Sequence, residues 1–344
     1  MAEKMLFGTY TKRISKGIYQ ADFDEQTGKM SNVEAIAEIG SPTYLAVSDA
    51  NVLYAVDKQD GQGGVAVYDY DAAGATAKLK QEVLADGASP AYVAVDEARQ
   101  LLYTANYHKG TVEVYRIATD GTLTQTDAFQ AVGSGPRPEQ DGPHMHFANL
   151  TPDNRLVAVD LGSDKVYTFD VSEAGKLSQV AVFETEAGFG PRHIRFSQDG
   201  KKAYLLGELS SQLSELNYDA ATGTFDLVQT LSTKPADWTE HNGAAAIYVS
   251  ADNRFIYTSN RGNNSIAVFQ VKADGSIDSR IQLISTEGDF PRDFALSPNE
   301  RYVIATNQNT DNATVYQRDT ETGRLTLQEK DIQVPEPVRV VFVK

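Results

Sequence analysis

The sequence predicts an all-β fold, a seven-bladed β-propeller with four antiparallel strands in each blade. The first observation is a repeat with successive spacings of 48, 49, 54, 47, 53 and 47 residues. The second is its strand character, because period-2 alternation with Tyr, Val and Phe favours strands over helices. Self-similarity at this period is typical of propellers. The repeat is marked by the last residue of an apolar strand, which is Thr9, Asp57, Asn106, Asp160, Gly207, Asn260 and Asn307.

Residues 191–223 show the elements of one unit in order. A first strand at 193–196 precedes the turn 197–200, a second strand at 203–207, a third at 213–219 and the turn 220–223. Asp, Asn and Gly supply side-chain-to-backbone hydrogen bonds or positive φ in such turns. They recur in two families of turns, at 152–154, 198–200, 251–253 and 298–300, and at 26–28, 273–275 and 321–323.

The two ends of the chain each carry part of a unit. Residues 5–8 correspond to a second strand, whereas residues 337–343 form a first strand that begins with Pro337. We expect the C-terminal strand to pair with the N-terminal strands, because this closes the ring and removes a free sheet edge. Residues 1–344 are therefore expected to form a single propeller domain.

Composition limits the partners of the protein. Lys and Arg number 31 against 47 Asp and Glu, a formal net charge of −16. This balance opposes nucleic acid or an anionic membrane as a partner. Cysteine is absent, residues 1–13 lack the apolar core of a signal peptide, and no apolar run approaches ~18 residues. We expect a cytoplasmic protein, and a monomer because a closed propeller needs no partner for stability.

Propeller topology brings the starts of first strands, the ends of second strands and the crossovers to one rim. His146 lies seven residues before Asp153, and Arg192 lies seven before Asp199, so the two occupy equivalent positions in adjacent blades. We expect one channel mouth to collect the basic side chains of strand starts and the polar side chains of strand ends. The first group is His144, His146, Arg192, His193 and Arg292, and the second is Asp160, Glu208, Asn260, Arg261, Asn307 and Gln308. A loop-capping role also suits the Asp and Asn residues.

Two long crossovers, 132–142 and 232–243, are expected to wall this mouth, and the second holds the only tryptophan, Trp238. No G-x-S-x-G, H-E-x-x-H or phosphate-binding Gly-Lys motif is present. Segment 57–64 lacks the later carboxylates of a calcium loop. Two His and a Glu suit a metal, but adjacent arginines disfavour a cation, so we expect neither a metal nor another cofactor.

Segments 142–171, 190–210, 251–269 and 290–316 carry P-H-x-H, P-R-H, E-L, S-N-R and N-Q elements. Together they resemble the seven-bladed propeller lactonase family, and the resemblance covers essentially the whole chain. The best-known activity of that family is 6-phosphogluconolactonase, and fungal carboxymuconate-lactonising enzymes belong to the same group. The resemblance implies a catalytic set of His146, Arg192, Glu208 and Arg261. From their place at the rim, we expect His144, His193, Arg292, Asp160, Asn260 and Gln308 to bind substrate.

The expected function is metal-free hydrolysis of 6-phosphoglucono-δ-lactone in the oxidative pentose phosphate route. Arg192 or Arg261 would stabilise the oxyanion, and His146 or Glu208 would move the proton. Arg292 would hold the phosphate or carboxylate of the substrate. Two alternatives stay open: a lyase or cycloisomerase that uses the same His/Glu pair, and a non-enzymatic propeller that binds protein or small ligands.

Overall fold

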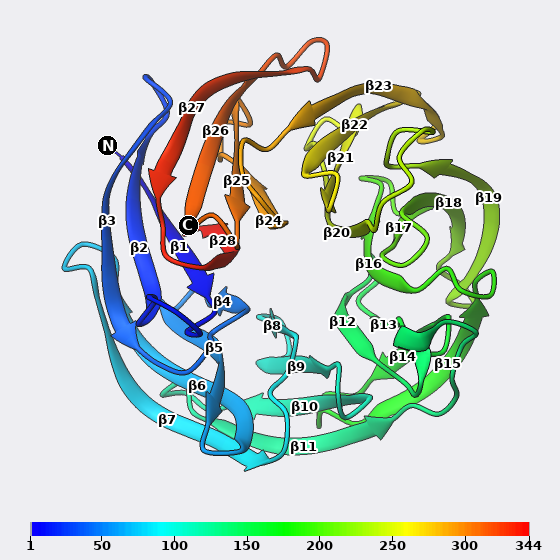
Figure 1. The fold of residues 1–344 in the computed structure, drawn as a ribbon. Helices are drawn as coiled ribbons and strands as arrows, with labels where there is room; N and C mark the ends of the chain where they lie inside the picture. Colours follow the sequence, from blue (N-terminus) through cyan, green and yellow to red (C-terminus); the bar gives the residue numbers. More distant parts are fainter. Residues whose placement is uncertain (1, 344) are drawn as a thin grey trace.

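The computed structural model describes residues 2–343 as seven four-stranded antiparallel sheets arranged in a ring (Figure 1). The only helix in this range is a short 3-10 helix, η1 (Pro138–Gln140). The prediction of a seven-bladed β-propeller is therefore confirmed.

The blades are numbered here from the N-terminus. Blade 1 joins β28 (Pro337–Phe342) to β1 (Glu3–Thr9), β2 (Gly17–Asp24) and β3 (Lys29–Glu38). Blade 2 contains β4 (Leu45–Val47), β5 (Val52–Gln59), β6 (Gln62–Asp71) and β7 (Thr76–Asp86). Blade 3 contains β8 (Tyr92–Asp96), β9 (Leu101–Asn106), β10 (Thr111–Ile117) and β11 (Leu123–Gln130).

The remaining four blades follow in chain order. Blade 4 contains β12 (Met145–Leu150), β13 (Leu156–Asp160), β14 (Lys165–Val171) and β15 (Leu177–Glu184). Blade 5 contains β16 (Pro191–Phe196), β17 (Lys202–Gly207), β18 (Gln212–Asp219) and β19 (Thr224–Ser232). Blade 6 contains β20 (Gly243–Val249), β21 (Phe255–Arg261), β22 (Ser265–Val271) and β23 (Ile277–Ser285). Blade 7 contains β24 (Pro291–Leu296), β25 (Tyr302–Asn307), β26 (Asn312–Arg318) and β27 (Leu325–Gln333).

The first strand of each blade lies nearest the axis and the fourth forms the outer wall (Figure 1). The second strands are largely buried, and β9 and β25 are buried over their whole length, because neighbouring blades cover both of their faces. The outer strands are largely exposed, as in β27. The core therefore lies between the blades, and it positions the ends of the inner strands.

Buried tyrosines link neighbouring blades. Each stands on a second strand, and its hydroxyl donates a hydrogen bond to the carbonyl of a turn glycine in the next blade. A buried hydroxyl needs such a partner, so the turn glycines are fixed as well. The pairs are Tyr54 with Gly121 (3.0 Å), Tyr204 with Gly275 (2.6 Å) and Tyr257 with Gly323 (2.9 Å).

The turns between first and second strands use the chemistry that the sequence predicts. The hydroxyl of Ser197 donates to Asp199 at 2.7 Å, and Thr151, Ser250 and Ser297 make the equivalent bond. The residue that ends the turn has positive φ, which is 71° at Gly200. Asp, Asn and Gly are therefore selected here by local backbone geometry.

The ring closes as expected. Strand β28 pairs antiparallel with β1, with Phe7 opposite Val340 and Leu6 opposite Val341. Strand β28 also packs on β24 of blade 7, where Arg339 forms an ion pair of 2.7 Å with buried Asp293. The N-terminal and C-terminal strands thus share one blade, and Figure 1 shows β1 and β28 side by side.

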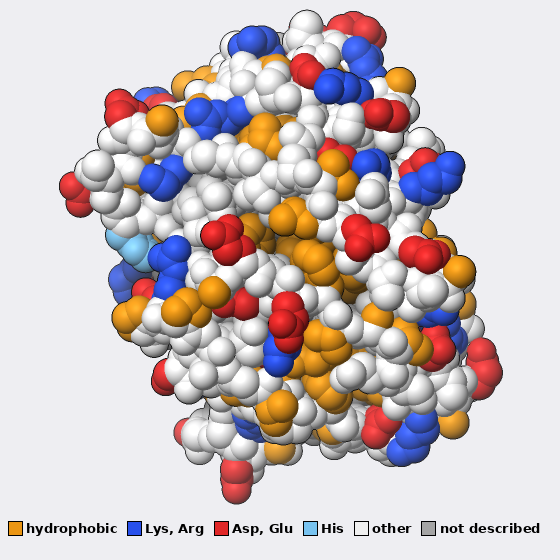
Figure 2. Space-filling view, turned by 90° about the vertical axis from the view of Figure 1, so that its right-hand side faces the viewer, with side chains coloured by type: hydrophobic (Ala, Val, Ile, Leu, Met, Phe, Trp, Pro, Cys, Tyr) orange, Lys and Arg blue, Asp and Glu red, His pale blue; other side chains and the backbone are white. Residues whose placement is uncertain are grey.

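The outer wall carries apolar side chains between charged ones, as Figure 2 shows for one side of the ring. Exposed apolar residues on outer strands include Val180 and Val182 of β15 and Leu227 and Val228 of β19. None of the helical structure in residues 2–343 is long and apolar enough to cross a membrane.

Candidate active site

A cavity of about 370 Å³ lies on the propeller axis, since all seven blades contribute to its lining. It opens at the rim where first strands begin and second strands end, which is the rim that the sequence predicts. Two sets of residues, each from one position of the repeat, contribute to its wall.

The first set comes from the starts of the innermost strands. The pairing register shifts between Met145 and Phe147 in blade 4, which leaves His146 as the extra residue of a β-bulge. The same shift in blades 5 and 7 isolates Arg192 and Arg292. A bulge re-aims a side chain beside an active site. These three side chains therefore occupy one structural position, and all of them line the cavity.

The second set comes from the residue that follows each repeat marker. Glu208 follows Gly207, and Arg261 follows Asn260. The same offset gives Tyr10, Lys58 and Tyr107, which also line the cavity.

Glu208 joins two arginines of the cavity wall. Its Oε2 lies 2.8 Å from Nε of Arg192, and its Oε1 lies 2.9 Å from Nη2 of Arg261. Burial alone would raise the pKa of Glu208, but the charges of Arg261 and Arg192 overcome it and lower that pKa to about 2. Burial and the charge of Arg261 lower the pKa of Arg192 to about 9. Glu208 and Arg192 are therefore both charged at neutral pH, and Glu208 is a weak base.

His146 is the basic group that this environment keeps neutral. Its side chain is buried, with 4% of the residue exposed, and Nδ1 has no hydrogen-bond partner among residues 2–343. Burial and the nearby charge of Arg192 hold the pKa of His146 well below its ordinary value. A neutral imidazole that lines a cavity beside two arginines is suited to accept a proton.

The other two predicted histidines differ in their access to the cavity. His193 lines it, and its ring lies 5.2 Å from that of His146 and 5.6 Å from that of Tyr92. His144 is outside the lining and stacks on Tyr107 at 4.3 Å. Both ring nitrogens of His144 are engaged, with the Tyr107 carbonyl at 2.8 Å and Asp141 at 2.9 Å. This placement favours a structural role for His144.

Three further residues of the predicted binding set also lie outside the cavity lining. Buried Asp160 accepts hydrogen bonds from the backbone N–H of His144 and Gly162, at 2.6 and 3.0 Å. Asn260 is buried and donates to the carbonyl of Thr233 at 2.8 Å. Gln308 is half-buried, and its backbone N–H donates to the carbonyl of Phe290. The contacts of Asp160 and Asn260 are those of loop caps.

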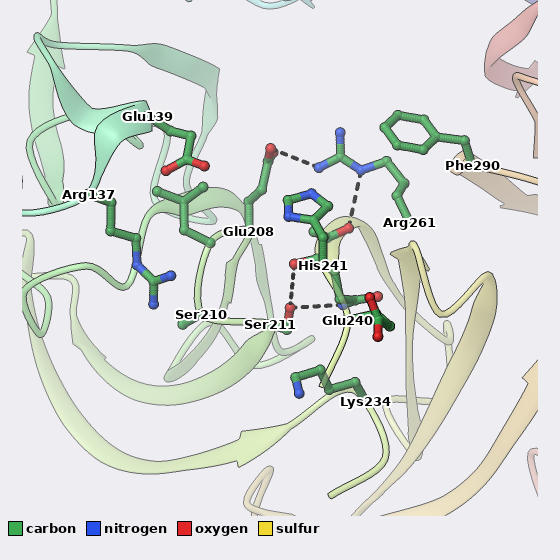
Figure 3. Close-up of a pocket in the computed structure, with 13 residues that line it drawn as sticks. Arg137, Glu139, Glu208, Ser210, Ser211, Lys234, Glu240, His241, Arg261 and Phe290 are labelled. Carbon is green, nitrogen blue, oxygen red and sulfur yellow. Dashed lines mark hydrogen bonds and ion pairs between the residues drawn. The ribbon is translucent and has the colours of Figure 1, made fainter. Parts of the chain in front are cut away.

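A second cavity, of about 450 Å³, adjoins the first across Glu208 and Arg261, which line both. Arg137 and Glu139 of the first long crossover and Lys234 of the second line it (Figure 3). The two long crossovers thus wall this adjoining space, whereas the axial cavity is lined by strand ends and by the crossovers that lead into blades 2 and 3.

Within residues 2–343, no group of three or more His, Asp or Glu side chains is arranged to hold a metal ion. The expectation of a metal-free reaction stays a prediction.

Comparisons with known proteins agree with this architecture. The family described as "Lactonase, 7-bladed beta-propeller" matches residues 4–342. The chain belongs to this family. It is 42% identical over 340 residues to the 6-phosphogluconolactonase of Bacillus subtilis, covering 98% of this chain and 97% of that protein.

Solved structures of similar proteins also match this propeller lactonase. A protein from Lactobacillus plantarum is 57% identical with a TM-score of 0.98, and the match covers 100% of both chains. The periplasmic gluconolactonase PpgL of Pseudomonas aeruginosa is 31% identical with a TM-score of 0.93, covering 100% of this chain and 99% of that one. The protein is a member of a lactone-hydrolysing family.

Among the lining residues of the cavity that the sequence analysis did not single out, Tyr10, Lys58 and Tyr107 share one position of the repeat. The signal was present, because each follows its marker by one residue, as Glu208 and Arg261 do. Strand alternation sends adjacent residues in different directions, so the marker caps the loop while its successor reaches the axis.

Gly207 is the marker of blade 5 in the propeller lactonase, and it has a steric reason to be glycine. A Cβ at this position would lie 2.8 Å from the ring of Phe189. The absent side chain lets that ring pack against the strand end that carries Glu208.

The change Glu208→Gln is expected to destabilise the propeller lactonase by about 3–5 kcal/mol, because it leaves two arginines without their shared carboxylate in a largely buried site. Urea unfolding at pH 7 measures this change. Glu139→Gln is the matched control, since Glu139 is exposed in the adjoining cavity and should change stability by less than about 0.5 kcal/mol. Equal stabilities of both variants would contradict the charge balance described above.

Proposed function

We propose that this propeller lactonase hydrolyses 6-phosphoglucono-δ-lactone to 6-phosphogluconate without a metal ion. The observation that carries the proposal is the neutral, buried His146 that lines the axial cavity together with the Arg192–Glu208–Arg261 cluster. The name of the Bacillus subtilis relative supports the choice of substrate.

The two arginines are suited to stabilise the negative charge that develops on the carbonyl oxygen. Within residues 2–343, protein partners engage Nε and Nη1 of Arg192 and Nε and Nη2 of Arg261. One terminal nitrogen of each arginine is left to donate to an oxyanion. Glu208 fixes both guanidinium groups before substrate arrives, and such preorganised donors contribute about 3–4 kcal/mol to transition-state stabilisation.

His146 is the group proposed to move the proton. It accepts a proton from water as the water oxygen attacks the lactone carbonyl carbon. When the bond from that carbon to the ring oxygen breaks, His146 returns the proton to the leaving alkoxide. The balance is one water consumed and one carboxylic acid formed, which ionises in solution. Glu208, whose pKa is about 2, is not assigned to proton transfer; its role is to hold the guanidinium groups of Arg192 and Arg261 in position.

The pH dependence of kcat tests whether the base is an imidazole that its surroundings keep neutral. Because burial and the charge of Arg192 hold the pKa of His146 well below its ordinary value of 6.5, kcat should stay level as the pH falls from 7.5 through 6.5. Stopped-flow rates between pH 4 and 7.5, corrected for spontaneous hydrolysis, measure the profile. An acidic limb centred near pH 6.5 would contradict the environment described for His146.

Isotope labelling tests whether the reaction is hydrolysis. In water enriched in ¹⁸O, a lactonase places one solvent oxygen in the product carboxylate, whereas a lyase places none. The label should enter the product at the enzymatic rate, above the spontaneous background. Product formation without label would replace hydrolysis by the lyase reaction.

A further inference from the structure

The half of the axial cavity that faces the catalytic cluster is basic. His146, Arg192, Glu208 and Arg261 come from blades 4, 5 and 6, whereas the opposite wall comes from blades 7, 1 and 2. That wall carries a set of basic side chains, called here the basic wall, which consists of Lys12, Lys58 and Arg292.

The charges of the basic wall have no acidic partner. Among residues 2–343, no ion pair joins any of its three side chains to a carboxylate. The cavity holds two carboxylates, and both are occupied: Glu208 by two arginines, and Asp293 by Arg339. Lys12 and Lys58 are exposed and Arg292 is half-buried, so this wall is a local unpaired positive charge, on a protein of net charge −16, that attracts an anion.

Tyr10 brings two of these cations together. Nζ of Lys12 lies 4.1 Å from the centre of the Tyr10 ring, and the guanidinium carbon of Arg292 lies 5.7 Å from it. The charges of Arg292 and Lys12 lower the pKa of Tyr10 below its ordinary value. The hydroxyl of Tyr10 is thus a strong hydrogen-bond donor within a cationic corner.

The loop that carries Lys12 is held in place by one buried carboxylate. Glu336, which is 1% exposed, accepts four backbone N–H hydrogen bonds at 2.9 to 3.1 Å. The donors are consecutive residues, Lys12, Arg13, Ile14 and Ser15. Lys12 therefore projects from a fixed backbone, which reduces the ordering cost of binding a ligand.

We propose that Lys12, Lys58 and Arg292, with the hydroxyl of Tyr10, form a subsite for a phosphoryl dianion at the substrate end remote from the lactone carbonyl. A phosphoryl group offers three acceptor oxygens, which suits three cationic donors from different directions. A cavity of about 370 Å³ is in the range of small-ligand sites. The subsite deepens the proposed lactonase function and rests on it, because it selects phosphorylated over neutral sugar lactones.

Substrate selectivity tests the subsite. The measured quantity is the ratio of kcat/KM for 6-phosphoglucono-δ-lactone to kcat/KM for glucono-δ-lactone. This ratio should exceed about 10² in the wild type. It should fall about 10–100-fold in Lys12→Met, Lys58→Met or Arg292→Met, because each variant loses a charge-assisted hydrogen bond to the phosphoryl group. Lys16→Met is the matched control, because Lys16 is exposed on the same loop outside the cavity lining and its loss alters net charge equally. It should keep the wild-type ratio.

Binding of inorganic phosphate separates the subsite from the lactonase activity. Calorimetry should detect phosphate binding to wild type and Lys16→Met, and none to the double variant Lys58→Met/Arg292→Met. Phosphate binding without lactone turnover would support the subsite and overturn the proposed function. A different result would overturn the subsite and leave the lactonase function in place. In that result the wild type turns over both lactones equally, and phosphate binding is either absent or unaffected by the double variant.

Discussion

His146→Ala is expected to lower kcat for lactone hydrolysis by about 10²–10⁴-fold, which is the usual contribution of a positioned general base. The reason is the environment of the imidazole: it is buried and neutral, it lines the cavity beside Arg192, and its Nδ1 has no hydrogen-bond partner among residues 2–343. KM should change less than kcat, because a proton acceptor acts in the transition state. Initial rates at pH 7, corrected for spontaneous hydrolysis, measure both constants.

Two further variants make the result specific to His146. His146→Gln conserves bulk and polarity, so a similar loss would exclude a packing defect as the cause. His144→Phe preserves a ring on Tyr107 at a position outside the cavity lining, and it should retain most of the activity. Turnover near the wild-type rate in His146→Gln would contradict the assigned role.

Deletion of residues 337–344 is expected to abolish cooperative folding or to lower Tm by more than about 10 °C. The deletion removes β28, with buried Val338 and Val340, and exposes the edge of β1. Each lost valine costs roughly 1.5–3 kcal/mol. Asp293 is left buried without Arg339, which costs about 3–5 kcal/mol more. Together these terms approach the whole stability of a typical domain, about 5–15 kcal/mol.

Calorimetric melting of the truncated chain and of Arg339→Met tests the closure. Arg339→Met preserves β28 but removes the ion pair to Asp293, so its Tm should lie between those of the wild type and the truncated chain. A truncated protein that melts at the wild-type temperature would show that pairing of β28 with β1 does not stabilise the ring.

The fold was predictable because the pattern of strands and turns repeats along the sequence. Turn residues such as Asp199 and Gly200 satisfy the local needs of the backbone, and the same hydrogen bond recurs in blades 4 to 7. Counting from these turns correctly placed His146 and Arg192 at equivalent positions, and the structure adds Arg292, which lies seven residues before Asn299.

The finer geometry of the site was not available from the sequence. A β-bulge turns His146 and Arg192 toward the axis, and a shift of one residue decides which side chains face the cavity. For this reason Asp160 and Asn260 looked equivalent to Glu208 and Arg261 in the repeat, although their hydrogen bonds are those of loop caps. The loop that presents Lys12 depends on Glu336, which is more than 300 residues away in the sequence.

The most direct test is the turnover of freshly generated 6-phosphoglucono-δ-lactone by wild type and His146→Ala, with a chelator present, at pH 7. We expect hydrolysis well above the spontaneous rate in the wild type, unchanged by the chelator and lost in the variant. A wild-type rate equal to the spontaneous rate, or activity that the chelator removes, would contradict a metal-free 6-phosphogluconolactonase centred on His146.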